Sequence, residues 1–149
     1  MDGGDVLRIG RTLHVGRSSR TNDAGLAQLA AWIEPLGYRV VPVTVTACLH
    51  LKSAATAIGD RTVLVNPAWV PAGAFEELDA LAIDPREPYA ANALRVGETL
   101  VYPSHFPART SGWSAGASTS RSRSAAKLAK AEGAVTCCSL IIEDVNPGV

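Results

Sequence analysis

The chain has 149 residues, which fits one domain, and its 47% hydrophobic and 19% charged residues are typical of a globular protein rather than a disordered one. The formal net charge of zero gives no general attraction to nucleic acid or to anionic membranes, so neither is expected as a partner. No apolar run approaches the roughly 20 residues that span a bilayer.

Cysteine usage and the N-terminus predict a reducing compartment. The three cysteines, two of them adjacent, do not have the pattern of a disulfide framework. The N-terminus lacks the basic and apolar regions of a signal peptide. We therefore expect a cytoplasmic protein. The chain starts abruptly on the turn motif MDGGDV, so either the protein begins there or the chain is part of something longer.

The N-terminal third of the chain predicts two strands, a helix and a third strand. Gly10-Arg11 is a tight-turn signal between two short β-rich runs, residues 6–9 and 12–15. Residues 38–45 form a continuous β-rich run, which is typical of a buried strand.

A helix is expected between the second and third of these strands. Asn22 supplies an N-cap and Gly37 a stop, so the helix should run to about Leu36. Its apolar residues recur at intervals of three and four, which predicts one buried face. These residues are Leu26, Leu29, Ile33 and Leu36.

The same order of elements then returns. Turn signals centre on Gly10, Gly59 and Gly97, each between two β-rich runs, which predicts a repeated β-hairpin. The later runs are residues 53–58, 62–65, 92–96 and 99–102. A short helix over 72–78 and a strand over 81–83 are expected after the second hairpin. Such a unit cannot bury its own faces, so several must pack together, and the alternation of strands and helices predicts the α/β class.

Residues 108–126 interrupt the third unit. They read ARTSGWSAGASTSRSRSAA and show neither a helical nor an alternating period, although a helix and a strand are due there. Three interpretations stay open: a flexible loop, an Arg/Ser segment that binds RNA or is phosphorylated, and a local reading-frame error. GC-rich codons read one frame over from Arg109 would give HQRLERGGFDVALAV, which is an amphipathic helix, a glycine turn and a strand. A short helix over 127–131 and a strand over 135–142 are expected to follow.

Two adjacent cysteines and one histidine are the candidate reactive groups. Cys137 and Cys138 lie at the head of the last expected strand, and His50 lies between two expected strands. A cysteine and a histidine form a common nucleophile and base pair. Because side chains alternate along a strand, one of the two cysteines should face a cleft while the other packs in the core. Cys48 lies in an apolar run and is expected to be a buried packing residue.

The cysteines and histidines do not have the spacing of a metal site. The sequence contains neither Cys-x-x-Cys nor His-x-x-x-His. Adjacent cysteines are also poorly placed to bind one tetrahedral ion. We therefore expect no metal.

The turn Asp2-Gly3-Gly4-Asp5 has two interpretations. It is either a loop with solvated acids or a receptor for a cation, since a carboxylate matches the planar donors of a guanidinium with two hydrogen bonds. Arg20 lies just before the first helix. It is either an exposed arginine in a capping sequence or a clamp for the carboxylate of a substrate.

Five stretches in this order, MDGGDV, SSRTN, LHLKS, YAANAL and EGAVTCCSL, resemble the dimethylargininases of the guanidine-modifying superfamily. They run from residue 2 to residue 140 and so cover nearly the whole chain. The resemblance implies a βα-propeller, or pentein, built of ββαβ modules around a pseudo-five-fold axis. Residues 1–149 would be the C-terminal catalytic portion, an incomplete propeller of about three modules.

The resemblance also implies a role for each candidate residue. Cys137 is the nucleophile, His50 is the general acid/base, and Asp2 hydrogen-bonds the guanidinium. Arg20 binds the α-carboxylate of the substrate, and the backbone near Ala131 helps to hold its amino-acid end. Neither a metal nor an organic cofactor is implied.

The implied reaction is hydrolysis of an Nω-methylated arginine to citrulline and methylamine or dimethylamine, through a covalent thiouronium intermediate. Related arginine deiminases typically carry His-x-Asp where this chain has His50-Leu51-Lys52. A lysine cannot accept hydrogen bonds from a guanidinium, which favours methylated over free arginine. Arginine deiminase-like activity is the alternative within the superfamily.

A different class of function also stays open. The chain would cover only about the second half of a typical family member, and the missing half would supply further substrate contacts. It would then be an inactive truncated remnant, or a half-enzyme that assembles with a separate N-terminal partner. A homo-oligomer is a further alternative.

Overall fold

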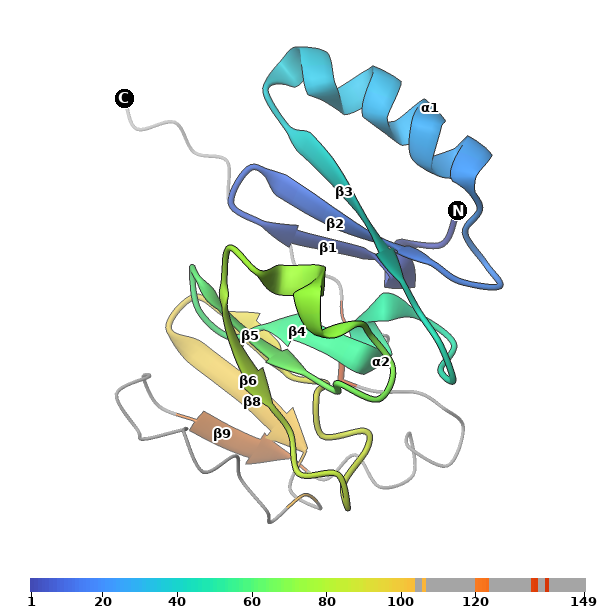
Figure 1. Cartoon of the computed structure of the whole chain (residues 1–149). Helices are drawn as coiled ribbons and strands as arrows, with labels where there is room; N and C mark the ends of the chain where they lie inside the picture. Colours follow the sequence, from blue (N-terminus) through green and yellow to red (C-terminus); the bar gives the residue numbers. More distant parts are fainter. Residues whose placement is uncertain (104–105, 107–119, 124–134, 137–138, 140–149) are drawn as a thin grey trace, which may run out of the picture.

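The computed structural model describes residues 1–103, 106, 120–123, 135–136 and 139. Within them the chain forms three modules, stacked in sequence order from top to bottom in Figure 1, each with one three-stranded sheet. In every sheet the first two strands are antiparallel and the second and third are parallel. The predicted α/β class and the repeated unit are therefore confirmed.

The first module comprises η1 (Gly3–Asp5), β1 (Val6–Ile9), β2 (Thr12–Arg17), α1 (Asp23–Ile33), η2 (Glu34–Leu36) and β3 (Arg39–Thr44). Gly10 takes a φ of 58° in the tight turn of the hairpin, a conformation that glycine adopts without strain. The side chain of Asn22 accepts a hydrogen bond from Gly25 N at 2.9 Å and caps α1. Gly37, with a φ of 79°, ends η2. The predicted hairpin, helix and third strand are all present.

Two predictions about burial in this module are wrong. Leu36 is 67% exposed, because the helix lies at the outer end of the module and only its side toward β3 is covered. In β3 the buried residue is Val43, and the other five are at least partly exposed. β3 is an edge strand of its sheet, which accounts for this exposure.

The second module comprises α2 (Leu51–Ala54), β4 (Ala55–Ala57), β5 (Thr62–Val65), η3 (Ala72–Phe75) and β6 (Asp79–Ala82). The predicted hairpin around Gly59 is confirmed, although the run that precedes it begins in a helical turn. The predicted helix over 72–78 is a single 3-10 turn. The predicted strand over 81–83 is present but begins two residues earlier, at Asp79.

The third module comprises β7 (Leu94–Val96), β8 (Thr99–Pro103) and β9 (Ser120–Arg123). β9 lies inside the segment 108–126, which was expected to be irregular, and it pairs with β8 in parallel, with Leu100 opposite Ser120. The expectation is wrong for these four residues, because backbone hydrogen bonds to a neighbouring strand do not require an apolar side-chain pattern. Whether the codons of this segment are shifted stays a prediction.

The strand expected over residues 135–142 is absent where the structure describes them. Val135 and Thr136 lie in a turn, and Ser139 N donates to Thr136 O at 3.3 Å. That one of Cys137 and Cys138 faces a cleft while the other packs in the core stays a prediction. Both cysteines, and the helix expected over 127–131, lie outside the described residues.

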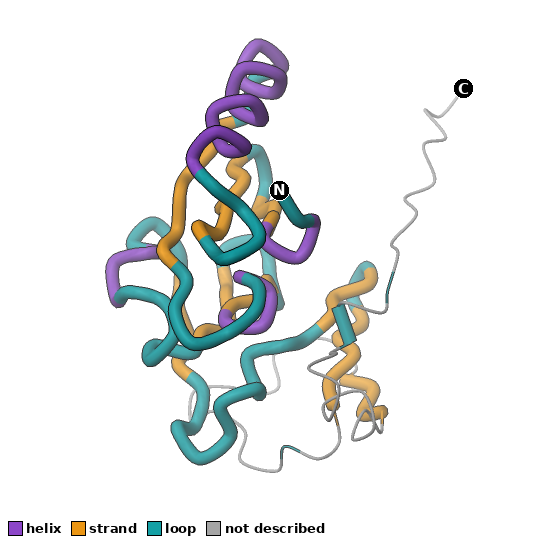
Figure 2. The backbone as a smooth tube through the Cα atoms, turned by 90° about the vertical axis from the view of Figure 1, so that its right-hand side faces the viewer, coloured by secondary structure: helices purple, strands orange, loops and turns teal. Residues whose placement is uncertain are grey.

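Two hydrophobic clusters join neighbouring modules. The cluster between the first and second modules includes Leu7, Val43, Leu51, Val63, Val65, Trp69 and Phe75. The cluster between the second and third includes Ile58, Leu64, Ile83, Ala91, Leu100 and Tyr102. Each module thus buries its apolar side chains against the next, as expected of units that cannot fold alone. Figure 2 shows α1 at the far end of the stack, where Trp32 is 70% exposed.

No helix in the described part of the chain is long and apolar enough to cross a bilayer.

Candidate functional site

Three of the predicted site residues lie at one edge of the first sheet. Because β1 is antiparallel to β2 and β2 is parallel to β3, the start of β1 meets the ends of β2 and β3. Asp2 precedes β1, Arg20 follows β2, and His50 follows β3. The order of strands therefore brings together residues that are far apart in the sequence.

His50 and Asp2 form the central pair of the site. His50 Nε2 lies 3.2 Å from Asp2 Oδ2, and the two side chains are 14% and 39% exposed. The contact lacks the alignment of a hydrogen bond, so its attraction is electrostatic and depends on a protonated imidazole. The ring packs against Gly4, where a Cβ atom would lie 2.7 Å from His50 Cγ. A carboxylate at this position stabilises an imidazolium, as general acid catalysis requires.

Asp2 is an anion at this site. Its Oδ1 accepts a hydrogen bond from Gly4 N at 3.0 Å. That N–H contributes most to lowering the pKa of Asp2, the interaction with His50 follows, and the charge of Arg20 contributes least. The carboxylate therefore stays ionised at neutral pH and can attract a cationic substrate.

Asp5 is the buried centre of a hydrogen-bond network behind the pair. It is fully buried, which excludes a solvated role for this acid of the turn. Its Oδ1 accepts from Leu51 N at 2.9 Å, and its Oδ2 accepts from Ser18 Oγ at 2.6 Å and Thr21 Oγ1 at 2.8 Å. Because Leu51 follows His50 in the chain, Asp5 fixes the histidine segment against the end of β2.

Thr21 completes the network on the other side. It is 2% exposed, and its Oγ1 accepts from Asp2 N at 3.1 Å while its hydroxyl donates to Asp5. Arg20 precedes it, and Arg20 N donates to Ser18 Oγ at 3.0 Å. The backbones of all three predicted site residues are thus tied to one buried carboxylate. The sequence showed Thr21 only as part of the stretch SSRTN, and its role was missed.

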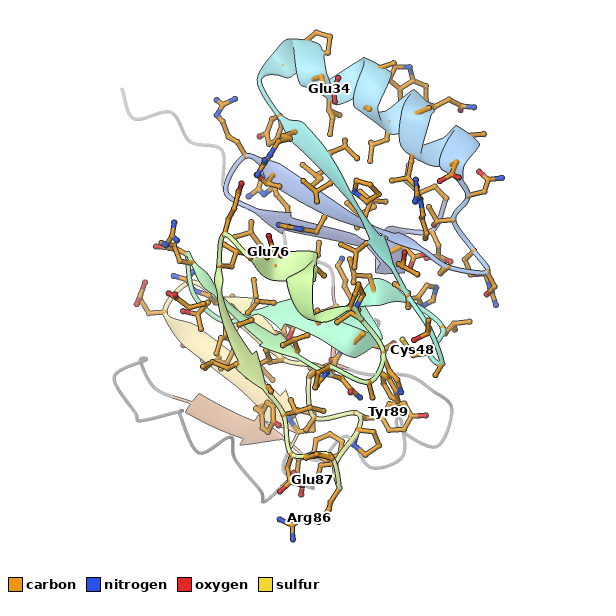
Figure 3. The ribbon with its side chains drawn as sticks, in the orientation of Figure 1. Glu34, Cys48, Glu76, Arg86, Glu87 and Tyr89 are labelled. Atoms are coloured by element: carbon orange, nitrogen blue, oxygen red, sulfur yellow. The ribbon has the colours of Figure 1, made fainter. Side chains whose placement is uncertain are left out.

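The loop between β3 and α2, which carries Cys48 (Figure 3), leads directly to His50. Thr46 N donates to Trp69 O at 2.9 Å, and Cys48 Sγ donates to His50 O at 3.3 Å. Cys48 is half-buried rather than fully buried as expected. Burial raises the pKa of its thiol to about 11, so it is neutral at physiological pH and unsuited to nucleophilic attack.

Lys52 lies in α2, two residues after His50. Its Nζ donates to Gly3 O at 3.2 Å, so the side chain supports the turn that carries Asp2. Lys52 also lies in the wall of a hollow of about 720 Å³, lined mainly by β1, β4 and β7, with Thr136 and Ser139 in the same wall. The segments before and after the two adjacent cysteines therefore face the same hollow as α2.

Two further residues are predicted for the site. Cys137 and Ala131 lie outside the described residues. Among those that the structure describes, no group of three or more His, Cys, Asp or Glu side chains is placed to hold a metal ion.

Comparison with curated proteins gives related sequences, although no protein-family model matches the chain. The chain is 62% identical over 64 residues to the N(G),N(G)-dimethylarginine dimethylaminohydrolase of Streptomyces coelicolor, an alignment that covers 43% of this chain and 25% of that protein. It is 29% identical over 107 residues to the protein of the same name from Pseudomonas aeruginosa, covering 72% of this chain and 42% of the relative. These alignments span less than half the length of the two relatives.

Solved structures show the same architecture. The dimethylarginine dimethylaminohydrolase of Pseudomonas aeruginosa, a cysteine-to-serine mutant complexed with citrulline, matches with a TM-score of 0.79 and 26% identity over 90% of this chain and 52% of that chain. An amidinotransferase of the saxitoxin biosynthetic pathway from Microseira wollei matches with a TM-score of 0.83 and 19% identity, over 96% of this chain and 47% of that chain. At 19% identity, the match with the amidinotransferase shows a likeness of fold alone.

The repeated modules and these likenesses define the class of protein: the chain has the fold of the guanidine-modifying superfamily and is an incomplete pentein propeller. Within that superfamily the curated relatives that the chain resembles are named dimethylarginine dimethylaminohydrolase, and each alignment covers part of their length. The fold and the relationship implied by the five stretches are confirmed.

Proposed function

We propose that this chain carries a dimethylargininase site, which hydrolyses Nω-methylated arginine to citrulline and methylamine or dimethylamine. The observation that carries the proposal is the contact of 3.2 Å between His50 and the ionised Asp2, at the same sheet edge as Arg20. The names of the curated relatives support the choice of substrate.

In the proposed mechanism the nucleophile is the thiolate of Cys137. Its sulfur attacks the guanidinium carbon, and the bond from that carbon to the methylated nitrogen breaks as His50 donates a proton to the departing amine. The product of this step is a thiouronium on Cys137. His50 then removes a proton from water, the water oxygen attacks the same carbon, and the carbon–sulfur bond breaks to release citrulline.

The other residues hold the substrate. Asp2 accepts hydrogen bonds from guanidinium N–H groups and also stabilises protonated His50. Arg20 binds the α-carboxylate through its planar fork of donors, and the backbone near Ala131 holds the amino-acid end. Lys52 offers no acceptor to a guanidinium, which favours a methylated over an unmethylated substrate. This mechanism uses neither a metal nor an organic cofactor.

An inactive remnant, or a half-enzyme that needs a separate partner, is the second candidate. The observation that favours it is the exposed apolar end of the stack, where Trp32 and Leu36 are 70% and 67% exposed. Large exposed apolar side chains make this end of the stack a candidate contact surface for another protein or module. A second copy of the chain could also cover it. Arginine deiminase-like activity would keep the same residues but act on free arginine.

Substitution of the two adjacent cysteines tests the assignment of the nucleophile. We expect Cys137→Ser to abolish citrulline release from asymmetric dimethylarginine, because a serine hydroxyl is not ionised at neutral pH. Cys138→Ser is the matched control and should retain turnover. Equal loss in both variants would mean that the wrong cysteine has been chosen.

A further inference from the structure

Asn92 is a buried amide that the proposed mechanism does not use. It belongs to the stretch YAANAL, lies just before β7, and is 1% exposed. Its Nδ2 donates to Lys52 O at 2.7 Å and to Thr136 Oγ1 at 2.6 Å. Its Oδ1 accepts from Thr136 N at 3.2 Å. The side chain therefore makes three hydrogen bonds to two segments that are far apart in the sequence.

The pattern of these bonds requires an amide. Two are donated by one nitrogen and the third is accepted by the oxygen, and a carboxylate or a single hydroxyl cannot reproduce that combination. In a buried site every lost partner leaves an unsatisfied polar group, so the arrangement resists distortion. Asn92 thus holds the two segments at a fixed separation.

The two segments are the ones that carry the reacting groups. Lys52 lies in α2, a helix of one turn that begins directly after His50. Thr136 immediately precedes Cys137 in the chain. We propose that Asn92 is a positioning residue, which sets the placement of the Cys137 segment relative to His50 and Asp2. This inference rests on the proposed function, because it takes Cys137 as the nucleophile.

Asn66 provides a matched control within the same chain. It is also a buried asparagine, 4% exposed, and its amide bridges backbone groups by donating to Pro88 O at 2.8 Å and accepting from Ala68 N at 2.9 Å. Neither of these side-chain contacts involves α2 or Thr136. Replacement of Asn66 should therefore loosen the fold to a similar degree without altering the relation of the two reacting segments.

The test compares two alkylating probes on the whole chain. Chloroacetamidine is a cation that Asp2 attracts, whereas chloroacetamide is neutral, and in both a thiolate displaces chloride to form a thioether. Alkylation of Cys137 is followed by mass spectrometry of its peptide, and each rate is divided by the rate of the same probe with a free thiol. The ratio of the two corrected rates reports how well Cys137 is placed against the cation site, independently of turnover.

We expect the unaltered chain to prefer chloroacetamidine at Cys137 by about tenfold or more, the size of one charge-assisted contact. Asn92→Ala should reduce that preference to about twofold or less, while Asn66→Ala keeps it. If the unaltered chain is active, Asn92→Ala should also lower kcat by about 100-fold with little change in KM, because misplacement by about 1 Å can have that effect.

The possible results separate the inference from the function. Absence of any preference in the unaltered chain would refute the proposed function and the inference with it. A preference that survives Asn92→Ala, or that Asn66→Ala removes equally, would overturn the inference alone. If Asn92→Ala does not fold, as judged by circular dichroism, Asn92→Asp decides, because it keeps the size and the acceptor but loses both donors. An unchanged preference for chloroacetamidine in Asn92→Asp would also overturn the inference.

Discussion

Thr21 is the residue through which the network behind the site can be tested. Thr21→Val keeps the shape of the side chain but leaves Asp2 N without its acceptor and Asp5 with one donor fewer. We expect the free energy of unfolding to fall by about 1–3 kcal/mol, the effect of an unsatisfied buried polar group. Thr21→Ser retains the hydroxyl and should lose about 1 kcal/mol or less. Urea denaturation measures both, and equal losses would contradict a role for the hydroxyl.

His14 gives the stability of the chain a dependence on pH. It is 7% exposed, and its ring lies 5.0 Å from Phe75 in the packing between the first two modules. Burial, and then the charge of Arg39, lower the pKa of His14 from its usual 6.5, while Glu77 opposes them. The unfolded chain therefore binds this proton more readily than the folded chain.

This difference in pKa sets the direction in which the free energy of unfolding changes with pH. The stabilisation is fully present above pH 6.5 and is lost as the pH falls below that value toward the lowered pKa of the folded state. We expect the free energy of unfolding to decrease from pH 7.5 to pH 5.5, measured by urea denaturation. His14→Gln removes the titrating group and should show a shallower decrease. An identical slope in both proteins would rule out His14 as the source.

The individual residues of the site were predictable to different degrees. Asp2, Arg20 and His50 could be named because their side chains carry the charge or the acid–base chemistry that a guanidinium substrate requires. Thr21 and Asn92 could not, because their importance comes from partners distant in the sequence. A polar residue gives no sequence signal for such a partner.

At the scale of elements, the loop between β3 and α2 stores strain next to the site. Ala47 has a φ of 55°, in the left-handed region that favours glycine. We expect Ala47→Gly to raise the free energy of unfolding by up to about 1 kcal/mol, because it removes a penalty of about 1–2 kcal/mol and adds the chain entropy of glycine. Ala27→Gly, on the exposed face of α1, is the matched control and should lower it by about 1 kcal/mol. A loss of stability in both variants would contradict the claim that the backbone is strained at Ala47.

The strands and turns were the most predictable elements. Glycines at the hairpin turns identified all three hairpins, and Asn22 and Gly37 bounded the helix region, because these residues act through local backbone geometry. β9 was missed since its pairing with β8 is a long-range property that its serines and arginines do not reveal. The burial of β3 and of Leu36 was misjudged for a similar reason, because exposure depends on what lies next to the module.

At the scale of the whole molecule, three modules share two hydrophobic clusters and bring the candidate site to one sheet edge. The sequence predicted the repeat, and with it the need for several modules to pack together. It could not predict which faces would stay open, and the exposed Trp32 shows one of them. The alignments with the curated relatives span less than half the length of those proteins.

The most direct test is citrulline release by the purified chain from asymmetric dimethylarginine, with free arginine as the comparison substrate and Cys137→Ser as the control protein. We predict release from the methylated substrate only, and none from the variant. Equal or faster release from free arginine would contradict the proposed substrate. No release from either would contradict a working site in this chain and would favour a remnant or a half-enzyme.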